Sequence, residues 1–377
     1  MTQAILPFIS FVFLLLIFDN ALTGEVLNLK GLIEEALKNN REVLIAESRW
    51  KTSTFKIPQA RSLPDPMFMF GYQNEGFRKY TFGESEDAQW MFSASQMFPF
   101  PGKLALRGEM AYREAESLKE SYDSIRLKTI KRIKELYYDL FLTYRDIELI
   151  RDKNALFSRI EEAALARYST GMAPQQEVLM AQTEKYMLLE KEEMLKQKIE
   201  SLEAMLNVAV GRNVSSPLGK PAEPVSTSYA YSIDEILKTA NENSPEIKSR
   251  KKTVNFAETR ILMAEKEYYP DITLTASLFK RAGEFDDMWS LATTINIPVY
   301  YRTKQRQAVH EAKSFLSEVV NELESTRLML SSEIRDNYSK IRAAEKLMEL
   351  YKSALIPKTY QDFELALSGY ATGKIEA

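Results

Sequence analysis

Two distant stretches of the sequence repeat one another. Residues 29–66 align with residues 233–270 at a constant offset of 204 positions. Further along, residues 166–171 align with residues 368–373 at an offset of 202. Because two separate anchors share nearly the same offset, chance does not explain the similarity. We therefore expect two copies of one structural unit in the chain.

Each copy contains the same predicted elements in the same order. A helix (about 29–62 and 232–267) is followed by a β-hairpin (66–98 and 270–298) and then by a long helix. Ser232-Ile-Asp-Glu235 has the spacing of a capping box at the start of the second unit. Proline and glycine between the two units indicate a linker. The predicted boundaries are a first repeat at 25–212, a linker at 213–231 and a second repeat at 232–377.

The predicted strands alternate with a period of two. Ile272, Leu274, Ala276 and Leu278 share one face of a strand, and Thr273, Thr275 and Ser277 share the other. Strands with one apolar and one small polar face are typical of a barrel that faces lipid outside and water inside. A soluble sheet gives the same alternation. Since four strands cannot close a barrel, several copies would each contribute four.

The same pattern recurs in the other strands. In the first hairpin, Phe68, Phe70 and Tyr72 are expected to pair with Trp90, Phe92 and Ala94, and Trp90 and Trp289 could lie in an interfacial girdle. The strand residues expected to face lipid are Leu274, Leu278, Trp289, Leu291, Trp90 and Phe92.

Two very long helices follow the hairpins, at about Gly102–Tyr168 and Arg302–Tyr370. Apolar residues recur at spacings of three and four in both, as they do in the helix that follows Gly171. Each long helix would measure about 100 Å. This length favours coiled-coil packing over an ordinary soluble bundle.

The N-terminus carries an apolar run of 14 residues, Ile5 to Phe18. It is shorter than the roughly 20 residues that a spanning helix needs, so we predict a signal peptide at residues 1–24. A buried core helix is the alternative. No second long apolar run follows Gly24, so the mature chain could span a membrane only with strands. N-terminal sequencing of the mature protein is expected to find cleavage between Ala21 and Glu25.

Composition excludes several kinds of chemistry. The chain has no cysteine and one histidine, His310, which we expect to be exposed on a helix. Thiol catalysis, disulfides and Cys-based zinc sites are therefore excluded. The 50 basic and 53 acidic residues give a net charge of −3, which argues against nucleic-acid binding.

No phosphate-binding loop or catalytic triad is present, so we predict no enzyme activity, no cofactor and no metal site. The methionines of the first hairpin are expected to fill gaps in packing, and a role in copper or silver binding is the alternative. They are Met67, Met69, Met91 and Met97.

The sequence resembles a known family, the TolC-type outer-membrane efflux ducts. The resemblance covers about residues 27–377 and depends on the order of the duplicated elements. It also depends on Gln96-Met-Phe-Pro-Phe-Pro-Gly-Lys103 before the first long helix, and on Tyr168-Ser-Thr-Gly171 and Tyr370-Ala-Thr-Gly373 after the two long helices. The Pro-Phe-Pro-Gly-Lys form looks most like the branch that serves heavy-metal and cation efflux pumps.

The resemblance implies a mainly α chain with a small β part. Three copies would form a 12-stranded transmembrane β-barrel in the bacterial outer membrane and a coiled-coil helical tunnel in the periplasm. The duct would export small toxic compounds or metal cations, with an inner-membrane pump and a periplasmic adaptor as partners. The implied adaptor-docking tip consists of Tyr168, Gly171, Tyr370 and Gly373, and the implied strand-to-helix junction consists of Pro101, Gly102 and Pro298.

Lys103 and Arg107 would lie near lipid headgroups or serve as solubilising charges at a helix start. The first repeat continues from Gly171 to Val210, whereas the sequence ends at Ala377, soon after Gly373. We therefore expect a fragment that lacks the last returning helix. The alternative function is a periplasmic coiled-coil scaffold or adaptor, and detergent dependence would separate it from a membrane duct.

Overall fold

The computed structural model describes residues 26–225 and 230–371, so the predicted signal peptide at 1–24 lies outside the described residues. The chain divides into two compact units. Within the described residues, one unit contains 26–32, 134–208 and 212–225, and the other contains 33–133, 209–211 and 230–371. The secondary structure is mainly helical with one small antiparallel sheet, as the sequence predicts.

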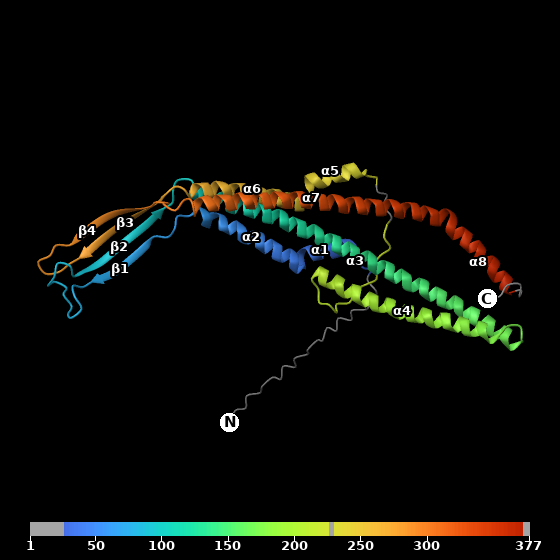
Figure 1. Cartoon of the computed structure of the whole chain (residues 1–377). Coiled ribbons are helices and arrows are strands. Elements are labelled where there is room, and N and C mark those ends of the chain that lie inside the picture. The colour runs from blue at the N-terminus through green and yellow to red at the C-terminus, as the bar shows by residue number, and fades with distance from the viewer. Residues whose placement is uncertain (1–25, 226–229, 372–377) are drawn as a thin grey trace, which may run out of the picture. The chain divides into compact units, whose positions relative to one another are not determined.

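The sheet has four strands in the order β1-β2-β3-β4 (Figure 1). Its strands are β1 (Met67–Gln73), β2 (Gln89–Phe98), β3 (Asp271–Lys280) and β4 (Met288–Asn296). All three pairings are antiparallel. The predicted pairing of Phe68, Phe70 and Tyr72 with Ala94, Phe92 and Trp90 is confirmed. The central β2–β3 pair joins the two repeats in one sheet.

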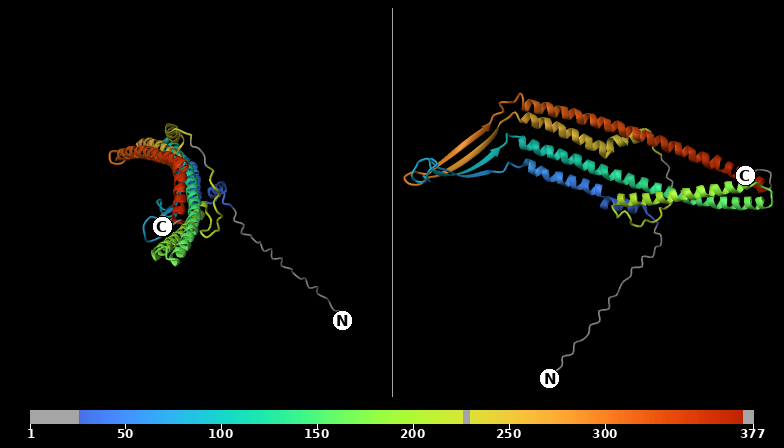
Figure 2. Two further views of the ribbon diagram at one scale, coloured as in Figure 1. Left: turned by 90° about the vertical axis from the view of Figure 1, so that its right-hand side faces the viewer. Right: turned by 60° about the horizontal axis from the view of Figure 1, so that its bottom comes forward.

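Four helices continue from the strands and lie side by side in one layer (Figures 1 and 2). They are α2 (Arg41–Arg61), the first part of α3 (Lys103–Ser169), α6 (Pro245–Lys266) and α7 (Gln305–Leu350). Trp50 of α2 stacks on Tyr122 of α3 at 5.9 Å between ring centroids. Side-chain contacts also join α3 to α6 and α6 to α7. The order across the layer is therefore α2, α3, α6, α7.

The prediction of one helix over residues 29–62 is wrong, because Asn40 separates α1 (Leu29–Asn39) from α2. Asn40 has extended backbone angles (φ −61°, ψ 127°), and its side chain accepts a hydrogen bond from the Val43 amide. It also donates to the Ala209 carbonyl at 2.8 Å. An N-cap residue cannot continue the preceding helix.

The second repeat breaks at the equivalent place, so the single helix predicted over 232–267 is wrong as well. Here α5 (Ile233–Asn243) is capped by Ser244, and Pro245 is the first residue of α6. Proline favours this position because its missing amide would have no partner in the first turn of a helix. The predicted capping box of Ser232 and Glu235 is confirmed.

The first long helix is confirmed as α3, which has 67 residues and a length of about 100 Å. The second predicted long helix is interrupted. After α7, Tyr351–Leu355 form a π-helical segment, and α8 (Ile356–Ala371) follows. Pro357 cannot donate the backbone hydrogen bond that a regular α-helix needs at this point. No helix within the described ranges is both long and apolar enough to cross a bilayer.

The helix α4 (Gln175–Val210) returns along α3. The interface buries predicted coiled-coil positions on both helices, including Leu140, Ile147 and Leu206. Ion pairs such as Lys185–Glu161, at 2.7 Å, flank it. The hydroxyl of Tyr137 joins the start of the first repeat to the linker, since it donates to the Leu27 carbonyl at 2.9 Å and accepts from the Ala222 amide at 2.8 Å.

Candidate functional site

One face of the sheet is mainly apolar, although the register also places Gln96, Thr293 and Lys280 on it. Phe92 lies opposite Leu278, and Leu278 lies opposite Trp289. Trp289 and Leu291 are 71% and 74% exposed in the single chain. A contiguous apolar surface of this kind marks a contact with a membrane or a partner. We call it the apolar face, and its apolar members are Phe68, Phe70, Tyr72, Trp90, Phe92, Ala94, Phe98, Ile272, Leu274, Ala276, Leu278, Trp289, Leu291 and Ile295.

The opposite face carries small polar residues. Ser93, Ser277 and Ser290 form one row across three strands. Along β3 the hydroxyl residues are half-buried, whereas the apolar residues that alternate with them are exposed. The register also places the four methionines of the first hairpin on this small-polar face.

Aromatic rings gather at the loop end of the first hairpin. Trp90 stacks on Phe70 at 5.1 Å and contacts Tyr72 at 4.8 Å between ring centroids. Tyr72 in turn stacks on Tyr80 at 5.0 Å. Trp90 is therefore half-buried among neighbouring rings. Such a cluster suits the boundary between lipid and water.

The sheet is open at both edges. In the part of the chain that the structure describes, β1 pairs only with β2, and β4 pairs only with β3. Each outer strand therefore presents unpaired backbone amides and carbonyls along its free edge. Proteins rarely leave long edges of this kind uncovered, because they invite pairing with another chain.

The junction between sheet and helices centres on Lys103, the first residue of α3. Its side chain is 2% exposed. The ammonium group donates to Asp271 Oδ1 at 2.9 Å, the Tyr269 carbonyl at 2.9 Å and Glu267 Oε2 at 3.2 Å. These acceptors match the three donors of an ammonium group. Asp271 also accepts the Phe100 amide at 2.8 Å, so one buried cluster links the two repeats.

Both interpretations of Lys103 from the sequence, as a headgroup anchor or a solubilising charge, are wrong. Its partners come from β3 and from the segment that joins α6 to β3, more than 160 positions away, and no local pattern points to them. Pro101 and Gly102 form the turn just before α3, where Gly102 has a φ of 93°. Pro298 lies in the segment between β4 and α7.

The turn between α3 and α4 is a compact helix stop. Gly171 has a φ of 74°, and its amide donates to the Tyr168 carbonyl at 3.0 Å. The Met172 amide donates to the Arg167 carbonyl at 2.9 Å. These two bonds define a Schellman motif, in which the left-handed position is usually occupied by glycine.

Apolar side chains surround this turn and point into solvent. Tyr168 is 44% exposed and Met172 is 74% exposed. In the second repeat Tyr370 lies within α8, and Gly373 lies outside the described residues. The structure therefore describes one of the two predicted turns.

A match to a family profile shows which family the chain belongs to. The profile described as Outer membrane efflux protein matches residues 32–212 and 236–377. The chain belongs to the outer membrane efflux protein family. Members of this family are the outer-membrane channels of tripartite efflux systems, and they transport compounds rather than transform them. No curated protein matches the chain at the level of sequence.

Solved structures of outer-membrane channels have a similar fold. The outer membrane protein VceC from Vibrio cholerae gives a TM-score of 0.76 at 18% identity, covering 92% of this chain and 86% of that chain. CusC gives 0.77 at 16% identity, with coverages of 92% and 83%. The Campylobacter jejuni CmeC outer membrane channel gives 0.71 at 14% identity, with coverages of 92% and 77%. At these identities the likeness establishes the fold of this efflux protein.

Proposed function

We propose that three copies of this efflux protein close a 12-stranded barrel in the outer membrane and form a passive duct, with a helical tunnel in the periplasm. The observation that carries the proposal is the open sheet, which is mainly apolar on one face and carries small polar residues, together with methionines, on the other. Pairing β4 of one copy with β1 of the next would satisfy both free edges. The apolar face would then touch lipid, and the small-polar face would line water.

The proposed periplasmic partner is an adaptor protein that docks at the α3–α4 turn. The exposed side chains of Tyr168 and Met172 support this assignment, because together they give the turn an apolar surface that a partner would cover. An inner-membrane pump would then select the cargo. The cargo class, small toxic compounds or metal cations, follows from the family resemblance alone.

The experiment that tests the proposal is a mass measurement. We expect the protein extracted from outer membranes to need detergent and to run as a trimer in micelles, because its strands leave two edges unpaired. Light scattering coupled to size exclusion would give the protein mass apart from the detergent. A stable monomer, or full solubility without detergent, would instead favour the periplasmic scaffold.

Arginine substitutions on β4 are expected to distinguish the two faces of the sheet. Leu291→Arg should cost about 2–4 kcal/mol of folding free energy in lipid near the bilayer midplane. Ser290→Arg, at the neighbouring position, should be tolerated because it would point into water. Equilibrium folding into lipid vesicles would measure both variants. Equal losses would contradict the assignment of the faces.

A further inference from the structure

The loop between β1 and β2 lies at the end of the sheet away from the helices (Figure 1). Its first part folds around the side chain of Asn74. The side-chain oxygen accepts the Thr81 amide at 2.9 Å. The side-chain nitrogen donates to the carbonyls of Gly76 and Lys79 at 2.9 and 2.8 Å. These bonds close residues 74–81 into a compact turn, which we call the knuckle.

Aromatic contacts join the knuckle to the apolar face of the sheet. Tyr80 of the knuckle stacks on Tyr72 at 5.0 Å between ring centroids, and Tyr72 contacts Trp90 at 4.8 Å. The Tyr72 hydroxyl also donates to Asn74 Oδ1 at 2.9 Å. Since Tyr72 and Trp90 belong to the apolar face, the knuckle continues this face beyond the ends of the strands.

Phe77 is held in the knuckle with its ring fully exposed. Single exposed apolar side chains are common on protein surfaces. This ring differs from them because it extends a face that the proposed function places in lipid. Transfer of such a ring from water to an apolar phase is favourable. Because the knuckle is already closed by its own hydrogen bonds, presenting the ring to a partner needs little further ordering.

A cationic side chain follows this ring in the sequence. Arg78 is exposed and has no ion pair within residues 26–225 and 230–371. Its neighbour Lys79, in contrast, binds Glu84. The whole loop, residues 74–88, contains four acidic and two basic residues, so it has no broad positive field that would attract anions. Recognition of an anion would therefore depend on the fork of the Arg78 guanidinium, which binds phosphate through two parallel hydrogen bonds.

A phosphate monoester suits this guanidinium better than a phosphodiester does. The monoester presents three acceptor oxygens and a charge of about −1.5 to −2 near neutral pH, whereas the phosphodiester of a glycerophospholipid has fewer free oxygens and less charge. Lipid A, the acylated glycolipid of the outer leaflet of bacterial outer membranes, carries phosphate monoesters next to its acyl chains. It thus combines the two chemistries that Phe77 and Arg78 would recognise.

We propose that the knuckle binds a glycolipid of the lipid A type, with Phe77 inserted among the acyl chains and Arg78 bound to a phosphate. The proposal rests on the proposed function, because that function places the apolar face in lipid and the helices in the periplasm. The loop at the other end of the sheet would then lie at the outer leaflet. The site would fix the level of the sheet in the membrane from its outer side.

Native mass spectrometry of the trimer in detergent would count the bound lipid. We expect lipid A to bind the unsubstituted trimer, and phosphatidylglycerol to bind it at least about tenfold more weakly. Arg78→Gln and Phe77→Ser should each weaken the binding of lipid A by about tenfold or more. If lipid A binds Arg78→Gln as tightly as the unsubstituted protein, or if phosphatidylglycerol binds as tightly as lipid A, the proposal is wrong.

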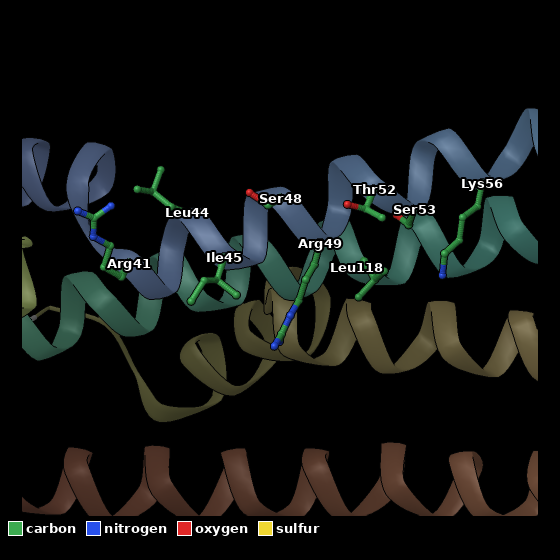
Figure 3. A pocket seen from close by; sticks show the side chains of 9 residues that line it. All are labelled: Arg41, Leu44, Ile45, Ser48, Arg49, Thr52, Ser53, Lys56 and Leu118. Carbon is green, nitrogen blue, oxygen red and sulfur yellow. The ribbon is translucent and has the colours of Figure 1, made fainter.

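Two exposed side chains far along the sequence supply matched controls. A groove of about 570 Å³ lies along α2, and Figure 3 shows the Arg49 side chain extending away from α2 beside it. Arg49 is exposed and has no ion pair among the residues that the structure describes. Met172, at the α3–α4 turn, is 74% exposed. Arg49→Gln and Met172→Ser should leave the binding of lipid A unchanged. Losses equal to those of Arg78→Gln and Phe77→Ser would overturn the proposal.

The absence of cysteine from the chain allows the insertion of the ring to be tested separately. A fluorophore attached to Phe77→Cys should be quenched by brominated acyl chains in bilayers that contain lipid A, whereas the same label on Met172→Cys should not. If the trimer inserts but the label at position 77 is not quenched, the knuckle does not enter lipid and the proposed duct stands.

The yield of trimer separates the remaining outcomes. If Phe77→Ser lowers the yield of trimer but leaves the binding of lipid A unchanged, the ring covers a second copy of the chain instead, and the proposal is overturned. If the unsubstituted protein forms no trimer in detergent, the duct is refuted together with this site.

Discussion

Lys103→Met is expected to destabilise the folded protein by about 3–5 kcal/mol. The substitution keeps most of the length of the side chain but removes the ammonium group that binds Asp271, Glu267 and the Tyr269 carbonyl. It would leave the Asp271 carboxylate partly buried without its counter-charge, and an uncompensated buried charge is costly. Chemical denaturation in detergent, followed by circular dichroism, would measure the loss.

Arg107→Met is the matched control. Arg107 lies one turn further along α3, approaches the same Glu267 at 3.7 Å and has a side chain that is 38% exposed. An exposed pair of this kind contributes about 1 kcal/mol or less. If Lys103→Met costs no more than Arg107→Met, the buried cluster does not hold the junction together.

The double variant Lys103→Met/Asp271→Asn separates the charge from the packing. Asparagine can still accept the hydrogen bond from the Phe100 amide but carries no charge. We expect it to recover part of the stability that Lys103→Met loses. A further loss in the double variant would show that Asp271 contributes independently of Lys103.

The fold could be predicted from the sequence wherever a regular period governs it. The alternation along Ile272–Leu278 fixes which side chains share a face, because a strand has a period of two. The spacing of Tyr137, Leu140 and Ile147 fixes the buried side of α3, because a helix repeats every 3.6 residues. The duplication supplied the order of elements in the second repeat.

The breaks in the helices could not be predicted so readily. Asn40 can continue a helix or cap one, and its bond to the Ala209 carbonyl, 169 positions away, favours the cap here. The π-helical segment before Pro357 is a local response to a proline, and several responses are possible.

The junction was missed for a different reason. A lysine after Pro-Gly at a helix start resembles any solubilising charge, and its burial follows only from the approach of α6 and β3. The order of the sheet likewise depends on the β2–β3 pairing, which no local pattern specifies. Contacts between distant segments therefore limit prediction at this site.

Gly171→Trp is expected to abolish export while leaving the trimer intact. The turn itself should survive, because no atom beyond the two neighbouring residues lies within 4 Å of a Cβ built at Gly171, and the strain of a left-handed residue costs only about 1–2 kcal/mol. The indole would, however, project beside Tyr168 and Met172, where the adaptor is proposed to dock. Efflux of a reporter compound and the yield of membrane-inserted trimer would both be measured.

Gly171→Ala is the control that separates bulk from strain. Alanine imposes similar backbone strain at a φ of 74° but adds only a methyl group. Efflux close to normal in Gly171→Ala, together with none in Gly171→Trp, would assign the effect to a blocked surface. Normal efflux with tryptophan present would show that the adaptor does not dock at this turn. Loss of the trimer in both variants would show that Gly171 acts through the fold, because a docking surface can be blocked without disturbing the assembly that presents it.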